Sequence, residues 1–260
     1  MPPFYKLRHS GYGTDRELYE IPQHTKVRFE PIGVFLGHSD IISEVFDFSY
    51  RMSFGAVGAH RPYRTGGTEN RHNGQIFVNA FQGKLAEFAL YEQLNNHYRV
   101  TYPDTRTYRR GIWDITDLTV QGIDVSVKST THKGNLLLLE TGDWDNRGVY
   151  LPNNKQYPFH FLIRISPDLK KIFKQHHLLY SDNCERETVE ALILNNDWQY
   201  DIPGFITNQE LIFLINDGFK ISQGSYLNRI IENNKMDAEN YYVKAYDMHG
   251  LNDIFDLLPV

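Results

Sequence analysis

The chain has 260 residues, of which 41% are hydrophobic and 23% are charged. These proportions are those of a globular protein and exclude a wholly disordered chain. The net charge of -5 excludes a protein that coats nucleic acid through bulk positive charge. No apolar run approaches the roughly 20 residues of a membrane helix, so we expect no membrane contact.

Cysteine usage and the N-terminal residues indicate a cellular compartment. The only cysteine, Cys184, excludes an internal disulfide and a zinc site built from several cysteines. Residues 1–6 lack the charged leader and apolar stretch of a secretory signal. We therefore expect a protein of the reducing cytoplasm. Because no low-complexity linker divides the chain, we expect a single domain over residues 1–260.

The first hundred residues combine irregular segments with one helix. Residues 1–50 predict irregular structure with short strands at 26–29 and 34–36. Residues 58–74 are rich in glycine, arginine and asparagine, which predicts a long loop. A helix is expected at about 83–96, since Leu85, Phe88 and Leu94 recur near one helical face.

The central segment predicts a β-hairpin. Residues 112–120 are rich in β-formers, residues 123–130 alternate apolar and polar side chains, and Gln121-Gly122 is typical of a turn. A two-residue turn places Thr119 opposite Asp124. One face of the hairpin then carries two carboxylates, two hydroxyls and an ammonium: Asp117, Thr119, Asp124, Ser126 and Lys128.

The remaining patterns complete a mixed α/β fold. Residues 136–140 and the apolar run 159–165 predict two further strands, the second of them buried and central. Helices are expected at 185–195 and after Thr207, where Thr207 and Glu210 form a capping-box pattern. Residues 241–243 predict a late strand. Helices on both sides of these strands favour a mixed central β-sheet flanked by helices.

The polar face of the hairpin could serve chemistry or simply face solvent. Oxygen ligands suit Mg²⁺, and a nearby lysine can orient water or stabilise an anionic phosphate. A hairpin taken alone is more often an ordinary exposed surface. The buried strands expected beside this hairpin favour a cleft instead.

Asp117 together with Ser126-Val127-Lys128 resembles the PD-(D/E)xK nuclease motif. A helix carrying Glu87 precedes the hairpin, as it often does in that superfamily. The resemblance covers about residues 80–170 and is strongest to type II restriction endonucleases. It implies a restriction-endonuclease-like core at about 80–170 with N- and C-terminal additions. It also implies an N-terminal DNA-contact region at about 50–80 and a C-terminal helical region at about 176–260.

Ser126 departs from the motif, because the family usually has a carboxylate at this position. Three acids could replace it: Glu140, Asp124 or Glu87. We favour Glu140, at the end of a run of four leucines, although a plain strand-end charge is an equal alternative. The catalytic residues that the resemblance implies are Asp117, Ser126, Lys128, Glu140 and Glu87. Asp117 with Glu140 or Asp124 would hold Mg²⁺, with Mn²⁺ as a substitute.

The resemblance implies sequence-specific hydrolysis of double-stranded DNA. A palindromic site would favour a homodimer, and a cognate DNA methyltransferase would protect the host. A structure-specific or repair DNase with the same core is an alternative. A catalytically inactive nuclease-fold DNA-binding protein is another, and an unrelated α/β protein is a third.

Two basic groups are candidates for DNA contact. Arginine suits the guanine edge and asparagine the adenine edge in the major groove. The candidates in the first loop are Arg61, Arg64, Asn70, Arg71, His72 and Asn73. A second group, Arg106, Arg109 and Arg110, would bind phosphates. Lys170 and its neighbours could extend this footprint or form an exposed helix face.

Other chemistries find little support. The histidines lack the spacing of a helical zinc site, and no glycine-rich phosphate loop ends in Lys-Ser or Lys-Thr. Cys184 could act as a thiol nucleophile beside a histidine, but a lone cysteine is commonly inert.

Overall fold

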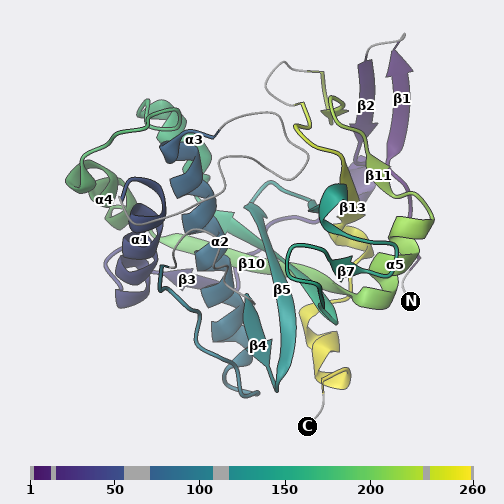
Figure 1. Cartoon of the computed structure of the whole chain (residues 1–260), viewed down its shortest axis with the longest axis horizontal. Coiled ribbons are helices and arrows are strands. Elements are labelled where there is room, and N and C mark those ends of the chain that lie inside the picture. Colours follow the sequence, from purple (N-terminus) through teal and green to yellow (C-terminus); the bar gives the residue numbers. More distant parts are fainter. Residues whose placement is uncertain (1–2, 13–15, 56–70, 108–116, 231–234, 259–260) are drawn as a thin grey trace.

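The computed structural model describes residues 3–12, 16–55, 71–107, 117–230 and 235–258. A five-stranded mixed sheet lies at its centre, in the order β3-β10-β9-β5-β4 (Figure 1). The strands are β3 (Gly33–Phe35), β4 (Leu118–Val120), β5 (Ile123–Thr131), β9 (Phe159–Ser166) and β10 (Trp198–Thr207). β5 and β9 run parallel, and the other neighbours are antiparallel. The predicted mixed sheet with flanking helices is confirmed.

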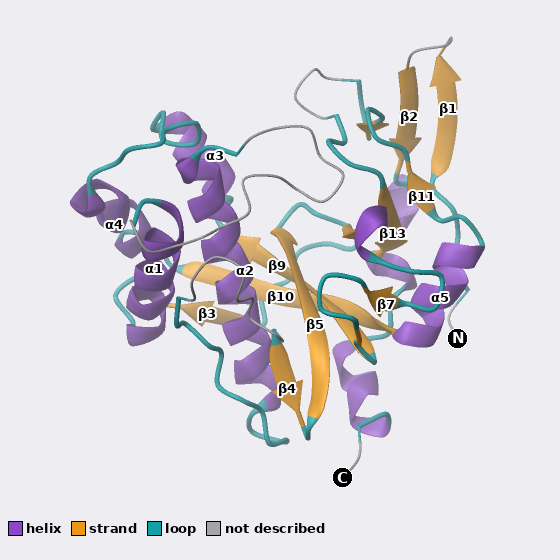
Figure 2. Ribbon diagram, viewed as in Figure 1, coloured by secondary structure: helices purple, strands orange, loops and turns teal. Residues whose placement is uncertain are grey.

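The helices cover this sheet (Figure 2). They are α1 (Asp40–Ser53), α2 (Asn73–Leu94), α3 (Leu169–Gln175), α4 (Arg186–Leu194) and α5 (Asn208–Asn216). Short 3-10 segments occupy Gln23–Thr25, Thr141–Asp143, Ala245–Asp247 and Leu251–Asp256. Within the described part of the chain, no helix has the length and apolar character that crossing a membrane requires.

Three smaller sheets flank the central one. β1 (Arg8–Tyr12), β2 (Arg16–Glu20) and β12 (Tyr226–Leu227) form the first. β11 (Lys220–Ile221), β13 (Asn240–Lys244) and β6 (Leu136–Glu140) form the second, and β7 (Val149–Tyr150) with β8 (Lys155–Gln156) the third. The strand expected at 136–140 is therefore present, but it belongs to a different sheet from the hairpin.

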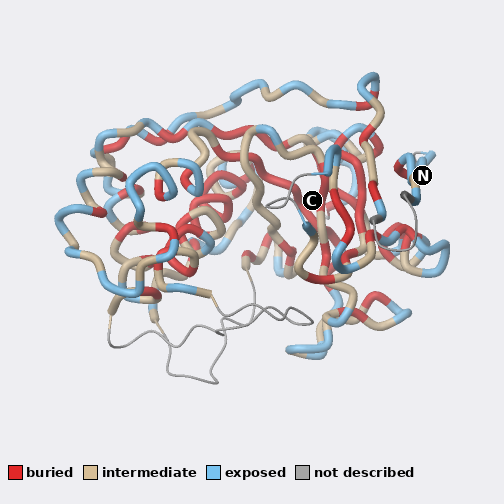
Figure 3. The backbone as a smooth tube through the Cα atoms, turned by 90° about the horizontal axis from the view of Figure 1, so that it is seen from above, coloured by how far each residue is buried: buried red, intermediate tan, exposed pale blue. Residues whose placement is uncertain are grey.

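Two apolar cores lie against the central sheet, and buried backbone runs through both (Figure 3). β9 shows the division: Phe161 and Ile163 join the core that contains α1, α2 and α4, whereas Leu162 joins the core that contains α5, β6 and β13. Seven consecutive residues of β9 are buried, because both faces of this strand are covered. The prediction of a buried central strand is confirmed.

The predicted hairpin is also confirmed. Leu118 pairs with Val125, Thr119 with Asp124 and Val120 with Ile123. Gln121 and Gly122 have φ values of 51° and 80°, which is the left-handed pair that a two-residue hairpin turn needs. Residues 112–116 of the expected first strand lie outside the described residues.

Several expected boundaries were wrong. Helix α2 begins at Asn73, not near 83, and Gly74 lets it approach a carbonyl: a Cβ there would lie 1.9 Å from the Leu178 oxygen. Residues 26–29 form no strand, and α1 occupies part of the segment expected to be irregular. The region 176–260 is not chiefly helical, because it supplies β10 to the central sheet. The expected core of 80–170 therefore omits β3 and β10.

Candidate active site beside β5

β5 is paired over different lengths on its two sides in the described part of the chain. β4 pairs only with residues 123–125, whereas β9 pairs with residues 126–131 on the other side. Among the described residues, no strand continues β4 along 126–131. Asp117 lies just before β4, and its Oδ2 accepts a 2.7 Å hydrogen bond from the Val127 amide of β5.

A pocket of about 470 Å³ lies beside this part of β5. Lys128 from β5 and Glu140 from the end of β6 both line it, although their strands belong to different sheets. Lys128 and Glu140, which the motif argument paired, therefore share one pocket. The remaining lining residues are Arg71, Val78, Asn79, Gln82, Val127, Ser129, Thr130, Thr131, Leu136, Leu138, Leu162, Lys170, Met236 and Asn240.

Strand alternation places Glu140 in this wall. Leu136, Leu138 and Glu140 line the pocket at every second position of β6, while Leu137 and Leu139 are buried in the second core. β13 holds the strand end in place, since Asn240 is the ladder partner of Glu140. The backbone of Glu140 is therefore held in a strand ladder.

The charges of the wall favour an anionic ligand. Arg71, Lys128 and Lys170 contribute three cationic side chains, against the single carboxylate of Glu140. The Lys128 ammonium also lies 5.9 Å from the centre of the Tyr150 ring. Amides and hydroxyls add neutral polar groups, and Gln82 Nε2 donates to Ser129 Oγ at 3.3 Å. Such a wall suits a phosphate group, which needs both charge and hydrogen-bond donors.

Asp117 lines a neighbouring pocket of about 410 Å³. Glu44 and Asp104 line the same pocket, so three carboxylates surround it. Glu44 is engaged already, accepting hydrogen bonds from Tyr102 Oη at 2.8 Å and Thr105 Oγ1 at 2.6 Å. Burial, followed by the Glu44 carboxylate, raises the pKa of Tyr102 to about 12, so the phenol stays protonated. Asp117 is thus hydrogen-bonded to β5 at Val127, the residue before Lys128, but its side chain lines a separate pocket.

The other two replacement acids do not line the pocket of Lys128. Asp124 accepts from Thr119 Oγ1 and Lys155 Nζ, each at 2.8 Å. Glu87 lies on the buried part of α2, where its carboxylate is 2.6 Å from Lys84 Nζ. Of the three candidates, only Glu140 faces the same space as Lys128.

Ser126 is buried, with 2% of its surface exposed, beside His160 on β9. Burial, and then the charge of Lys128, lowers the pKa of His160 to about 3. This histidine is therefore neutral near pH 7. A buried serine beside a neutral imidazole does not replace the carboxylate of the motif.

The structure describes four of the nine expected DNA contacts. Arg71 lines the pocket with Lys128. His72 and Asn73 bind Asp182 instead, with His72 Nδ1 at 3.1 Å from Oδ2 and the Asn73 amide at 3.1 Å from Oδ1. Arg106 forms an ion pair with Asp104 at 2.7 Å. Arg61, Arg64, Asn70, Arg109 and Arg110 lie outside the described residues.

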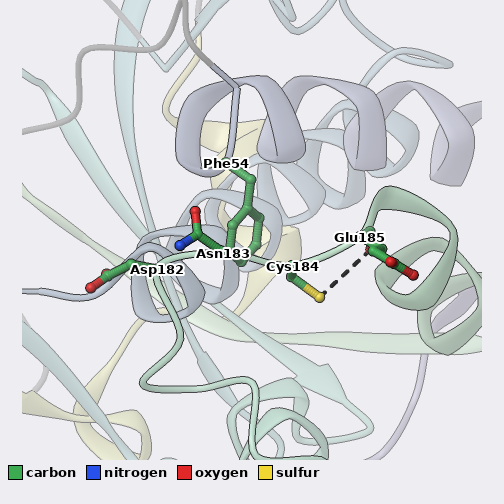
Figure 4. Close-up of a pocket in the computed structure, with 5 residues that line it drawn as sticks. All are labelled: Phe54, Asp182, Asn183, Cys184 and Glu185. Atoms are coloured by element: carbon green, nitrogen blue, oxygen red, sulfur yellow. Dashed lines mark hydrogen bonds between the residues drawn. The ribbon is translucent and has the colours of Figure 1, made fainter.

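Cys184 has surroundings that do not favour a thiol nucleophile (Figure 4). Its pocket of about 360 Å³ is lined by Phe54, Asp182, Asn183, Cys184 and Glu185, none of which is a histidine. Burial, and then the charge of Glu185, raises the pKa of the Cys184 thiol. The protonated thiol is a poor nucleophile.

Comparisons of the chain with protein-family models, with curated proteins and with solved structures gave no match.

Sequence reasoning missed three polar lining residues: Asn79, Gln82 and Asn240. Asn79 and Gln82 are three positions apart on α2 and share a face, but the helix was expected to begin after them. Asn240 reaches the pocket only through the pairing of β13 with β6, which no local pattern predicts.

Proposed function

We propose that the chain is a Mg²⁺-dependent endonuclease of the type II restriction class, which hydrolyses phosphodiester bonds of double-stranded DNA at a specific sequence. The observation that carries the proposal is the shared pocket of Lys128 and Glu140. Both residues were selected in the sequence analysis, and Arg71 and Lys170 add cations to the pocket that suit a phosphate. The proposed setting is the cytoplasm, with a cognate methyltransferase in the same system.

The carboxylates of the two pockets meet part of what Mg²⁺ requires. This ion commonly uses one or two protein carboxylates and completes its shell with water and substrate phosphate. Glu140 supplies one carboxylate in the pocket of Lys128, and Asp117 supplies one in the adjoining pocket. Among the described residues, no three His, Cys, Asp or Glu side chains converge as a preformed metal cage. The set therefore fits an ion held mainly with its substrate.

Each charged side chain of the pocket would have a separate role in hydrolysis. Glu140 would hold the ion from the pocket of Lys128, and Asp117, which lines the adjoining pocket, would have to reach it from there as the second carboxylate. Lys128 would orient the attacking water and balance the charge that develops on the phosphate. Arg71 and Lys170 would position the flanking phosphates. Bound Mg²⁺ would supply Lewis-acid stabilisation of the transition state.

A digest of unmethylated phage DNA, with Mg²⁺ and with EDTA, tests this proposal. Discrete fragments that require Mg²⁺ are expected, and the sequenced ends would give the site and the overhang. A Mg²⁺-dependent smear would favour the structure-specific or repair DNase. Intact DNA with salt-sensitive binding would favour the inactive DNA-binding protein, and no binding would favour an unrelated function.

Glu140→Gln tests the identity of the replacement acid. Loss of the carboxylate should reduce Mg²⁺-dependent cleavage by about 100-fold or more, with DNA binding retained. Asp124→Asn serves as the matched control, because Asp124 pairs with Lys155 outside the pocket. If Asp124→Asn abolished cleavage and Glu140→Gln did not, the assignment of Glu140 would be wrong.

A further inference from the structure

The outer face of α3 carries three lysines beside the candidate active site. Two apolar residues of this helix are buried in the first core, and the exposed face of the helix carries the α3 lysines, Lys170, Lys171 and Lys174. Lys170 also lines the pocket of Lys128. The positive charge of the pocket wall therefore continues along the surface of α3.

Packing holds α3 in a fixed place next to the pocket (Figure 1). The ring of Phe173 stacks on that of Phe77 in α2, with 5.1 Å between their centres. The same helix α2 supplies Asn79 and Gln82 to the pocket wall. Since both elements share one core, the α3 lysines start from a backbone that is rigid relative to the site.

The α3 lysines lack the ion pairs that several surface cations have elsewhere in the chain. Lys6 lies 3.3 Å from Asp217, and Lys220 lies 3.2 Å from Glu239. Among the described residues, no carboxylate forms such a pair with an α3 lysine, and residues 169–177 contain no acid. In a chain with a net charge of -5, this surface keeps three positive charges uncompensated.

The adjoining pocket has the opposite charge. Glu44, Asp104 and Asp117 line it together with a single cation, Arg106. An anion too long for the pocket of Lys128 is therefore repelled on the side of Asp117 and attracted on the side of α3. The charges thus favour one direction for a polyanion that passes through the site.

We propose that the α3 lysines bind the sugar-phosphate backbone of the DNA that flanks the cleaved bond, so that the duplex leaves the active site over α3. This inference rests on the proposed function, because it takes the bound polyanion to be DNA. Lys170 and Lys174 are one helical turn apart, about 6 Å along the axis, which is close to two steps of about 3.4 Å along one DNA strand. Phosphate contacts position a duplex without reading its sequence, so we expect this surface to bind DNA of any sequence.

The salt dependence of DNA binding tests the proposal. Fluorescence anisotropy of a labelled duplex in EDTA gives the affinity without cleavage. At about 100 mM salt, Lys171→Gln/Lys174→Gln should bind about tenfold more weakly than the wild type. Its plot of log affinity against log salt should be shallower by about 2, because each phosphate contact contributes about 0.9 to the slope. Lys170 stays in place in this variant, so the pocket wall is unchanged.

Lys6→Gln/Lys220→Gln is the matched control. It removes the same two charges from exposed sites that already pair with acids, and it should keep the wild-type slope. An equal fall in slope in the control would indicate a general effect of net charge and would overturn the role of α3. Circular dichroism would show that both variants keep the fold.

The Mg²⁺ digest separates this inference from the proposed function. If the wild type cleaves DNA and Lys171→Gln/Lys174→Gln keeps the wild-type slope, the role of α3 is overturned and the nuclease stands. If the wild type binds DNA without cutting it and the variant has the shallower slope, the α3 surface stands and the nuclease is overturned. A wild type that does not bind DNA would overturn both.

Discussion

At the scale of single residues, burial decides which acids can take part in chemistry. Glu87 and Lys84 are 11% and 4% exposed and lie 2.6 Å apart on α2. Breaking a buried ion pair leaves a charge without its partner, which costs about 3–5 kcal/mol. The pair therefore lets α2 bury two charged side chains without leaving either charge alone. The sequence could not show it, because a lysine and a glutamate three positions apart usually form an exposed helical pair.

His160 supplies a prediction about acid sensitivity. Its imidazole is neutral in the fold, with a pKa lowered to about 3, but would take up a proton near pH 6.5 when unfolded. Between pH 3 and pH 6.5 the unfolded state therefore binds more protons than the folded state. Stability should fall as pH drops below 6.5, by about 1.4 kcal/mol per unit for this residue, and level off near pH 3.

Urea unfolding of His160→Gln at pH 7.5 and pH 5 checks this expectation. The variant should lose less stability than the wild type between the two pH values, because the titrating group is gone. His24→Gln, at an exposed position, is the control and should follow the wild type. Equal pH dependence in His160→Gln and wild type would show that His160 does not carry the effect.

At the scale of elements, local patterns predicted some structures well. The hairpin was predictable because Gln121-Gly122 fixes its register, and the helix after Thr207 because its cap is local: Thr207 and Glu210 form the expected box. Helix α1 was missed although Ile42, Val45 and Phe46 follow a helical period. The segment was expected to be irregular, and the packing of α1 against α2 completes an apolar face that the local pattern alone did not make decisive.

Two glycine substitutions test how the backbone conformation at each glycine affects the stability of the fold. Gly122→Ala should lower the free energy of unfolding by about 1 kcal/mol, since φ is 80° and alanine rarely adopts that conformation. Gly83→Ala should raise it by about 0.5–1 kcal/mol, because Gly83 lies inside α2. A Cβ meets nothing within 4 Å at either position, so the two changes differ in backbone alone. Equal effects in denaturant titrations would contradict this account.

At the scale of the whole molecule, the candidate site depends on contacts that sequence patterns do not contain. The pocket joins α2, β5, β6 and the start of β13, which belong to separate layers and sheets. Lys128 was predicted from a motif, and Glu140 from its place at the end of a run of four leucines. Asn79 and Asn240 enter only through the packing of α2 on β5 and the pairing of β13 with β6.

The most direct test of the central claim is the rate of Mg²⁺-dependent DNA cleavage by Lys128→Met. Lys133→Met is the matched control, because Lys133 is exposed in the turn after β5 and does not line the pocket. Lys128→Met should cleave about 100-fold more slowly or worse while still binding DNA, and Lys133→Met should cleave like the wild type. Unimpaired cleavage by Lys128→Met, or intact DNA with the wild type, would contradict the account.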